Sequence, residues 1–305
     1  MPLRSPTSNL HFALQDIIGQ TRTTGNTFFV DSGATGASDA DGRSGRDPSN
    51  PVATVDHAVS LCTASNGDLI ILMPGHAETL AAATTWAMDK AGITVVGLGS
   101  GAVRPTFTLT ATASNVAITA ANCVIENCIF TCGTADHTTT MTIAADETTI
   151  RNCKFLNITG FQQITQILVG SADNDADNTR IEGCRFEAVA VGTTQAIHLA
   201  QVQDGVVIDN CSATGEFLVA CIANPGSEVL TDLTIQNCFF HNDDADQLAI
   251  ELLSACTGQL INNVMTGGIA GAVGMVNAGS CTNTQCFVHD GEADRTSILS
   301  HAVVA

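Results

Sequence analysis

The sequence predicts an all-β protein: a single-stranded right-handed parallel β-helix (a solenoid) with a short N-terminal capping helix. Three observations predict this fold. One motif recurs in order along the chain, short apolar runs alternate with turn-forming residues, and charged residues make up only 13% of a sequence that is 45% hydrophobic. Ordered repetition of one motif indicates one supersecondary unit per repeat, with length changes confined to the turns.

The repeated motif combines an Ile, an Asn or Gly, a Cys and, in most copies, a Phe. Its first copy is IENCIF at positions 125–130, and later copies centre on Cys153, Cys184, Cys211 and Cys238. Counted from Cys128, these cysteines are 25, 31, 27 and 27 residues apart, and weaker copies follow at 260–265 and 286–287. Each repeat is therefore expected to form one coil, stacked about 4.8 Å from the next.

The Asn or Gly of each motif is expected to form a corner between two strands. Strict alternation would point the Ile and this residue to the same face. A left-handed turn at Asn or Gly resets the alternation and lets Ile, Cys and Phe all point inward. Equal residues then stack in ladders. The expected amide ladder, with side chains hydrogen-bonded along the stack, consists of Asn127, Asn152, Asn210, Asn237 and Asn262.

The cysteines form a second expected ladder, beside an aliphatic ladder of the isoleucines. Neighbouring coils are close enough for disulfides, but a reducing cytoplasm favours free thiols that pack as small hydrophobic residues. No two of the twelve cysteines are spaced as C-x-x-C, which argues against a zinc ribbon. The expected thiol ladder consists of Cys128, Cys153, Cys184, Cys211 and Cys238.

The segments before the repeats predict the N-terminal cap and the first coils. Residues 28–31 indicate a short strand, and residues 32–50 a polar loop. Apolar positions 55, 58, 59 and 62 share one helical face after Thr54, the predicted N-cap, so a short helix is expected to cover the open end of the first coil. Residues 69–73 form the first buried strand, which ends at Pro-Gly.

This pattern divides the chain into three segments. Residues 26–290 form the β-helix, residues 1–25 an N-terminal arm, and residues 291–305 a C-terminal tail or cap. The arm is expected either to anchor the protein or to pack on the N-terminal cap. The tail is expected to cap the last coil or to bind a neighbour.

The charge excludes some partners. Thirty acidic and eleven basic residues give a net charge of −19, which repels phosphate backbones, so no nucleic-acid partner is expected. No apolar run approaches the roughly 18–20 residues of a membrane span, and the N-terminal residues do not resemble a secretory signal. We therefore expect no membrane insertion, and assembly in a cytoplasm.

The sequence predicts no catalytic, cofactor or metal site. The acidic cluster at 241–246 is interpreted as a solvated turn, because hydrolysis needs a spaced pair of carboxylates. Lys154 and Arg185 occupy equivalent positions in consecutive repeats and are expected on an outer face beside acidic residues. The loop at 173–177 has D-x-D-x-D spacing but lacks the later Gly and Glu of an EF-hand. An irregular calcium site there or at 39–42 stays open.

The N-terminal part also resembles a known family. The runs FFVDSG (28–33), PVATVDHAVSLC (51–62) and GDLIILMPGHAETL (67–80) resemble the corresponding segment of pectate-lyase-like right-handed β-helix proteins. This form is similar to β-helix proteins encoded in the structural regions of tailed bacteriophages. The resemblance covers about residues 26–290. It implies the fold more specifically than the function.

Phage proteins of this kind include tailspikes, fibres and capsid decoration proteins, and they are often trimers. The resemblance therefore implies a non-enzymatic structural virion protein, most simply a homotrimeric capsid decoration (cement) protein that binds itself and the major capsid protein or another virion protein. The alternatives are a tailspike or fibre that binds or depolymerises a host surface glycan, and a free carbohydrate-active enzyme. The chain has no Tyr and one Trp, which leaves few aromatic platforms for sugars and favours the structural role.

Overall fold

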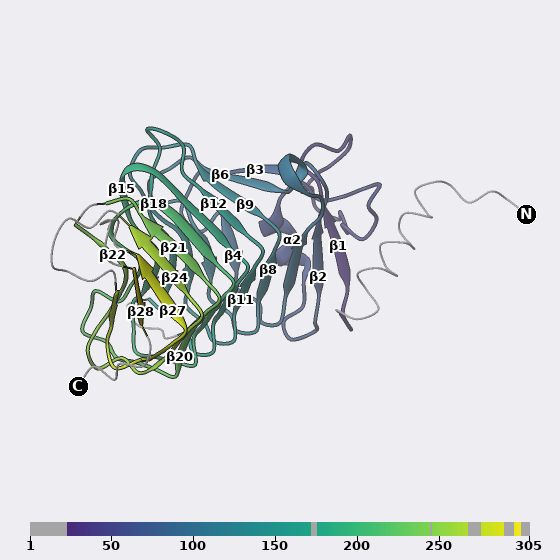
Figure 1. Ribbon diagram of the computed structural model, residues 1–305. Coiled ribbons are helices and arrows are strands. Elements are labelled where there is room, and N and C mark those ends of the chain that lie inside the picture. Colours follow the sequence, from purple (N-terminus) through teal and green to yellow (C-terminus); the bar gives the residue numbers. More distant parts are fainter. Residues whose placement is uncertain (1–22, 172–175, 245, 268–275, 290–295, 300–305) are drawn as a thin grey trace, which may run out of the picture.

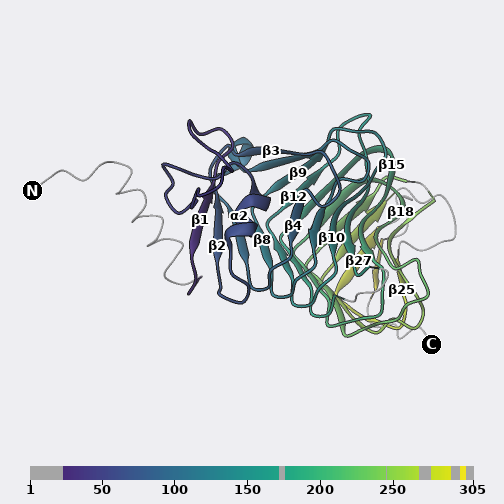
Figure 2. The ribbon, with the colours of Figure 1, turned by 180° about the vertical axis from the view of Figure 1, so that it is seen from behind.

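The computed structural model describes residues 23–171, 176–244, 246–267, 276–289 and 296–299. Over these ranges the chain winds as a right-handed parallel β-helix, so the predicted fold class is confirmed. Figures 1 and 2 show the coils stacked in sequence order, from β1 at the N-terminal end to β27 at the C-terminal end. Nearly every strand pairs in parallel with its equivalent in the next coil, so long-range pairing builds the sheets.

One face of the solenoid is a continuous sheet of ten strands in coil order. The Ile of each motif lies in this sheet, and Ile125, Ile150, Ile181, Ile208 and Ile235 are paired in register and fully buried. The strands are β1 (Thr27–Val30), β2 (Leu69–Leu72), β5 (Thr94–Gly97), β8 (Val124–Glu126), β11 (Thr149–Arg151), β14 (Arg180–Glu182), β17 (Val207–Asp209), β20 (Leu233–Gln236), β23 (Gly258–Ile261) and β26 (Thr282–Thr284).

The second face follows the first corner and carries the Phe of each motif. Its last strand, β28, pairs antiparallel with β27, whereas the other pairs are parallel. The strands are β3 (Ala77–Leu80), β6 (Thr106–Leu109), β9 (Ile129–Cys132), β12 (Lys154–Leu156), β15 (Arg185–Leu199), β18 (Ser212–Ala223), β21 (Phe239–Asn242), β24 (Val264–Gly267), β27 (Cys286–His289) and β28 (Thr296–Leu299).

The third face closes each coil. The long strands β15 and β18 run from the second face into the third. The second and third faces therefore belong to one hydrogen-bonded sheet. A separate two-stranded sheet and a 3-10 turn lie at corners of the coils: β16 (Gln203–Asp204) with β19 (Leu230–Thr231), and η2 (Gly101–Val103). The remaining strands of the third face are β4 (Trp86–Met88), β7 (Val116–Ile118), β10 (His137–Ile143), β13 (Gln163–Val169), β22 (Leu248–Leu252) and β25 (Val276–Ala278).

In the first sheet, the corner after each strand from β8 to β23 has the left-handed backbone that the motif predicted. Pairing of the flanking strands aligns these corners, with a Gly replacing Asn in one coil. Asn and Gly tolerate this conformation better than other residues, which explains their recurrence here. The values of φ lie between +52° and +62° at Asn127, Asn152, Gly183, Asn210, Asn237 and Asn262.

A second left-handed corner precedes the same strands, and the sequence did not predict it. The flanking strand pairs align these corners as well. One of its residues, Glu147, is not a typical turn former at positive φ, so the sequence does not mark this position in every coil. The values of φ lie between +50° and +75° at Gly67, Gly92, Asn122, Glu147, Asn178, Gly205 and Asp232.

Aromatic rings form one stack through the core. Trp86 and Phe107 begin it with ring centroids 4.6 Å apart, and Phe130, Phe155 and Phe186 continue it at spacings of 5.6, 5.1 and 5.0 Å. All five side chains are fully buried. The ring spacing matches the spacing of paired strands, so the stack follows directly from the repeat.

The predicted N-terminal helix is confirmed as α2 (Val55–Leu61), with Thr54 as its N-cap. Its apolar residues Val55, Ala58 and Val59 are buried in the core of the first coil. Asp56 Oδ1 accepts a hydrogen bond of 3.0 Å from the Ala87 amide of β4. The helix therefore covers the edge of the third face, whereas the edge of β1 is covered by the loop, through Gly45 and Val52.

Candidate functional site

The amide corner shows how the predicted ladder is built. Asn262 Nδ2 donates to Asn237 Oδ1 at 2.9 Å, along the stack as expected. Asn237 Nδ2, however, donates to Asp209 Oδ1 at 3.0 Å, and Asn127 Nδ2 donates to the Gly97 carbonyl at 2.7 Å. Gly183 interrupts the row of amides between Asn152 and Asn210. What all the corners share is the backbone conformation, and the side-chain bonds differ from coil to coil.

The five motif cysteines stack directly behind this corner and are buried, with 0–2% of each side chain exposed. They are free thiols, as are the other seven cysteines of the chain, which are also buried. The sulfurs of adjacent coils interact with each other and with backbone carbonyls, such as Cys211 Sγ to the Ile181 carbonyl at 3.4 Å. Burial raises the pKa of Cys128 and Cys184 well above the ordinary value, which favours the neutral thiol. The column therefore acts as packing.

Charged residues form a row on the outer surface of the first sheet. Glu126, Arg151, Glu182 and Asp209 occupy the same position in consecutive coils. Arg151 Nη2 lies 3.2 Å from Glu126 Oε2, and the next acid, Glu182, accepts from Arg180 Nε at 2.9 Å. Both arginines are thus already engaged by carboxylates of the same surface.

A second charged group lies on the outer surface of the second face. Lys154 and Arg185 are paired in register, as the repeat predicted. Both bind Glu187 Oε1, at 3.2 Å from Lys154 Nζ and 2.9 Å from Arg185 Nε. This cluster is partly exposed and balances charge within the surface, so its contribution to stability is small, on the order of 1 kcal/mol or less per pair.

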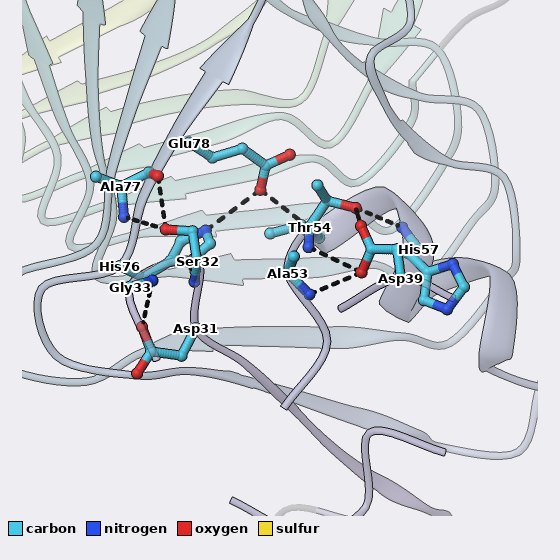
Figure 3. A network of polar contacts seen from close by, with 11 residues as sticks. Asp31, Ser32, Gly33, Asp39, Ala53, Thr54, His57, His76, Ala77 and Glu78 are labelled. Atoms are coloured by element: carbon cyan, nitrogen blue, oxygen red, sulfur yellow. Dashed lines mark hydrogen bonds and ion pairs between the residues drawn. The ribbon is translucent and has the colours of Figure 1, made fainter. Parts of the chain in front are cut away.

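A polar network joins the loop, helix α2 and the first coils, and is shown in Figure 3. The carboxylate of Glu78 is buried, and its Oε2 accepts from the Val55 amide at 3.0 Å and lies 3.2 Å from His76 Nε2. The other ring nitrogen, His76 Nδ1, accepts from the Ser32 amide at 3.0 Å. Glu78 thereby links the start of the helix to the strand that follows the first corner.

Ser32, His76 and Glu78 resemble the residue types of a catalytic triad, but their geometry differs. The Ser32 hydroxyl donates to the Ala77 carbonyl at 2.7 Å. The His76 nitrogen on that side is already occupied by a backbone amide. A triad needs the histidine to accept the serine hydroxyl proton. The network therefore fastens the loop and the helix to the coil.

Two of the acidic loops have structural roles. Asp39 Oδ1 accepts from the Ala53 amide at 2.7 Å, and its Oδ2 accepts from the Thr54 hydroxyl at 2.7 Å, so this carboxylate holds the start of α2 (Figure 3). In the other loop, Asp243 Oδ1 pairs with His241 Nε2 at 2.8 Å, and Asp244 Oδ1 accepts from the Asp246 amide. The loop at 173–177 lies largely outside the described residues. Among those that are described, no group of acidic, His or Cys side chains is arranged to hold a metal ion.

Sequence reasoning missed an aspartate row and a buried polar column. Asp146 Oδ1 accepts from the Asp177 amide at 3.0 Å, and Asp177 Oδ1 accepts from the Asp204 amide at 2.8 Å, so each carboxylate supports the next coil. Inside the third face, His137 and Gln163 are paired in register and fully buried. Burial lowers the pKa of His137. Their separation of 26 residues matches the motif period, so extending the repeat alignment to this segment would have revealed the column.

These features define a single-chain parallel β-helix protein with charge-paired outer faces. Its fold is similar to that of a pectate lyase, Pel9A (TM-score 0.55, 14% identity, covering 90% of this chain and 80% of that one). It is also similar to a rhamnogalacturonan lyase, with a TM-score of 0.50 and 13% identity over 81% of this chain and 75% of that one. The ORF18 protein of Geobacillus virus E2 is similar as well, with a TM-score of 0.50 and 11% identity over 97% of this chain and 67% of that one. At these identities the likeness establishes the shared fold.

Comparison of the sequence with protein families and with curated proteins gave no match. Within the described ranges, no helix has the length and apolar character needed to cross a membrane.

Proposed function

We propose that this protein is a non-enzymatic structural component of a tailed-phage particle, a homotrimer that decorates the capsid. The observation that carries the proposal is the pairing of charges on the outer faces. Arg151, Lys154, Arg180 and Arg185 each bind a carboxylate of the same surface. On such faces the basic side chains are already paired with carboxylates, which suits a structural surface better than a site that must leave a base free to react.

Two further observations support a place on a virus particle. The segments at 28–33, 51–62 and 67–80 resemble phage β-helix proteins, and they form β1, α2, β2 and β3 together with the network around Glu78. The fold is also similar to that of a Geobacillus virus protein over 97% of this chain. In this proposal the arm of residues 1–25 contacts the major capsid protein or another virion protein, and the β-helix projects from the particle.

The test combines binding and activity. Particles that lack this protein are incubated with the purified chain and sedimented, and reducing-sugar release is measured on a panel of polysaccharides. We expect co-sedimentation, its loss when residues 1–25 are deleted, and no sugar release. The deleted form must keep the melting temperature of the full chain, so that lost binding is not lost folding. Sugar release without particle binding would overturn the proposal.

A tailspike or fibre that depolymerises a host polysaccharide is the second candidate. It is favoured by the row of Glu126, Arg151, Glu182 and Asp209, because neighbouring coils place these half-buried side chains about 4.8 Å apart along one outer face. If this candidate is correct, Asp209→Ala and Arg151→Ala abolish sugar release, whereas Gln236→Ala, in the same row, has no effect.

A further inference from the structure

The last coils expose an apolar column on the second face. Phe239, Val264 and Phe287 are paired in register on β21, β24 and β27, and they point outward with 43%, 36% and 45% of their surface exposed. In the preceding coils the same column holds Lys154, Arg185 and Ser212. The column therefore changes from polar to apolar at the C-terminal coils. Adjacent exposed apolar residues of this kind indicate a contact surface.

This face carries fewer carboxylates than the rest of the acidic chain, which favours a second copy of the chain as its partner. Across β12, β15, β18, β21, β24 and β27, its two outward columns contain one carboxylate, that of Glu187, and a second, that of Asp243, is paired with His241 at the end of β21, in a protein with thirty acidic residues. Two copies with a net charge of −19 repel each other over most of their surfaces. They can approach most easily where carboxylates are scarce and apolar side chains are exposed.

The neighbouring polar groups are already paired, which disfavours a sugar ligand. His241 Nδ1 lies 2.7 Å from the Thr266 hydroxyl, and His241 Nε2 lies 2.8 Å from Asp243 Oδ1. A sugar would need hydrogen-bond partners beside the aromatic rings, and both nitrogens of this imidazole are engaged within the chain. The surface therefore offers apolar contact with little free hydrogen bonding.

We propose that this face, centred on Val264 and flanked by Phe239 and Phe287, is where copies of the chain associate. The inference rests on the proposed homotrimer and names its contact. Copies related by an axis parallel to the solenoid bring equal coils to equal heights, so the apolar coils meet each other. At the height of Lys154 and Arg185, the same arrangement brings basic side chains near Glu187 of the adjoining copy.

Site-directed crosslinking tests the contact. All twelve native cysteines are buried, so a cysteine introduced on the surface is the reactive thiol under native conditions. Val264→Cys is treated with a short bismaleimide, and Val202→Cys, where Val202 is 60% exposed, is the matched control. Because each chain carries one reactive thiol, we expect covalent dimers from Val264→Cys and none from Val202→Cys. Crosslinking at position 202 alone, or at neither position, would overturn the proposed face.

Mass in solution provides the second measurement. Light scattering of the unmodified chain should give about three times 31.5 kDa, and Phe239→Ser/Phe287→Ser should reduce it to 31.5 kDa with an unchanged melting temperature. The control Phe161→Ser/Val202→Ser removes two other exposed apolar residues, 41% and 60% exposed, and should leave the mass unchanged.

The outcomes separate the two proposals. A wild-type monomer, or an oligomer that survives the Phe239→Ser/Phe287→Ser change while folded, overturns the face. So does a polysaccharide that binds the wild type and not this variant. A dimer by light scattering that crosslinks through position 264 supports the face and contradicts only the trimer. If the Phe variants do not fold, the crosslinking pair still decides. Loss of particle binding bears on the virion role alone.

Discussion

Asn237 and Asn262 occupy the same corner of two consecutive coils, and Asn262 Nδ2 donates a hydrogen bond of 2.9 Å to Asn237 Oδ1. Both residues have left-handed backbones, with φ of +55° and +53°. The residue at this corner therefore has two roles. It adopts a backbone conformation that most residues disfavour, and its side chain forms a hydrogen bond to the next coil.

These two demands are separable by substitution at Asn237. Asn237→Gly keeps the backbone conformation and loses the side-chain bonds to Asn262 and Asp209, so we expect a cost of about 1 kcal/mol. Asn237→Ala loses the same bonds and adds the strain of a left-handed Ala, roughly 1–2 kcal/mol more. Urea unfolding measures both, with Gln236→Ala as the outward-facing control. Equal costs for the Gly and Ala variants would contradict the corner assignment.

The aromatic stack predicts a large effect of one core substitution. Phe155 lies 5.1 Å from Phe130 and 5.0 Å from Phe186, so Phe155→Ala leaves a cavity between two coils. We expect a loss of about 3–5 kcal/mol in the free energy of unfolding. Phe161→Ala is the control, since Phe161 is 41% exposed and its truncation should cost well under about 1 kcal/mol. Similar melting temperatures for the two variants would argue against a continuous stack.

The thiols should be protected in the folded protein. Burial raises the pKa of Cys62 and of Cys281 to about 12, so few of these groups are thiolates near neutral pH. The five motif cysteines are themselves buried, with 0–2% of their surface exposed, so iodoacetamide should modify none of them in the native state and all of them after denaturation, as counted by peptide mass spectrometry. Disulfide-linked peptides joining Cys153 and Cys184 in a native digest would contradict this expectation.

The same pKa values predict alkaline destabilisation. The folded chain keeps the Cys62 proton up to about pH 12, whereas the unfolded chain releases it near the ordinary value of 9.0. Stability from this group is complete below pH 9 and is lost as the pH rises from 9 towards 12. The chain has no Tyr and only two Lys, so thiols dominate proton release in this range. Melting temperatures should fall steadily from pH 9 to 11, and less steeply in Cys62→Ala. A flat profile would oppose the buried-thiol assignment.

The network around Glu78 predicts local instability at the N-terminal cap. Glu78→Ala leaves the Val55 amide and His76 Nε2 without their buried acceptor, at a cost of about 1–3 kcal/mol for each group. Glu78→Gln retains one acceptor and should cost less. Hydrogen exchange at 54–60 should accelerate in Glu78→Ala while exchange in β11 stays unchanged. Equal exchange in both variants and the wild type would show that the helix is held by its apolar face alone.

Much of this architecture could be predicted from the sequence, because each coil of a parallel β-helix repeats the local environment of the previous one. The interval between Cys128 and Cys153 determined which strands pair, and the Asn or Gly of each motif determined where the chain turns. Burial of Ile150, Cys153 and Phe155 then follows from residue spacing and the reset of alternation at the corner. The N-terminal helix was equally visible, since an N-cap and a helical apolar face are local signals.

Tertiary structure alone decided the remaining features. The left-handed backbone at Glu147 is imposed by neighbouring coils, because its local sequence does not require it. Lys154 and Arg185 both pair with the carboxylate of Glu187, and Glu78 accepts a hydrogen bond from the Val55 amide. Both arrangements depend on residues that come together from separate elements. The spacing of the repeats in the sequence specifies which residues share a column. The hydrogen-bond or ion-pair partner of each side chain depends on distances and burial that exist only after the coils have stacked.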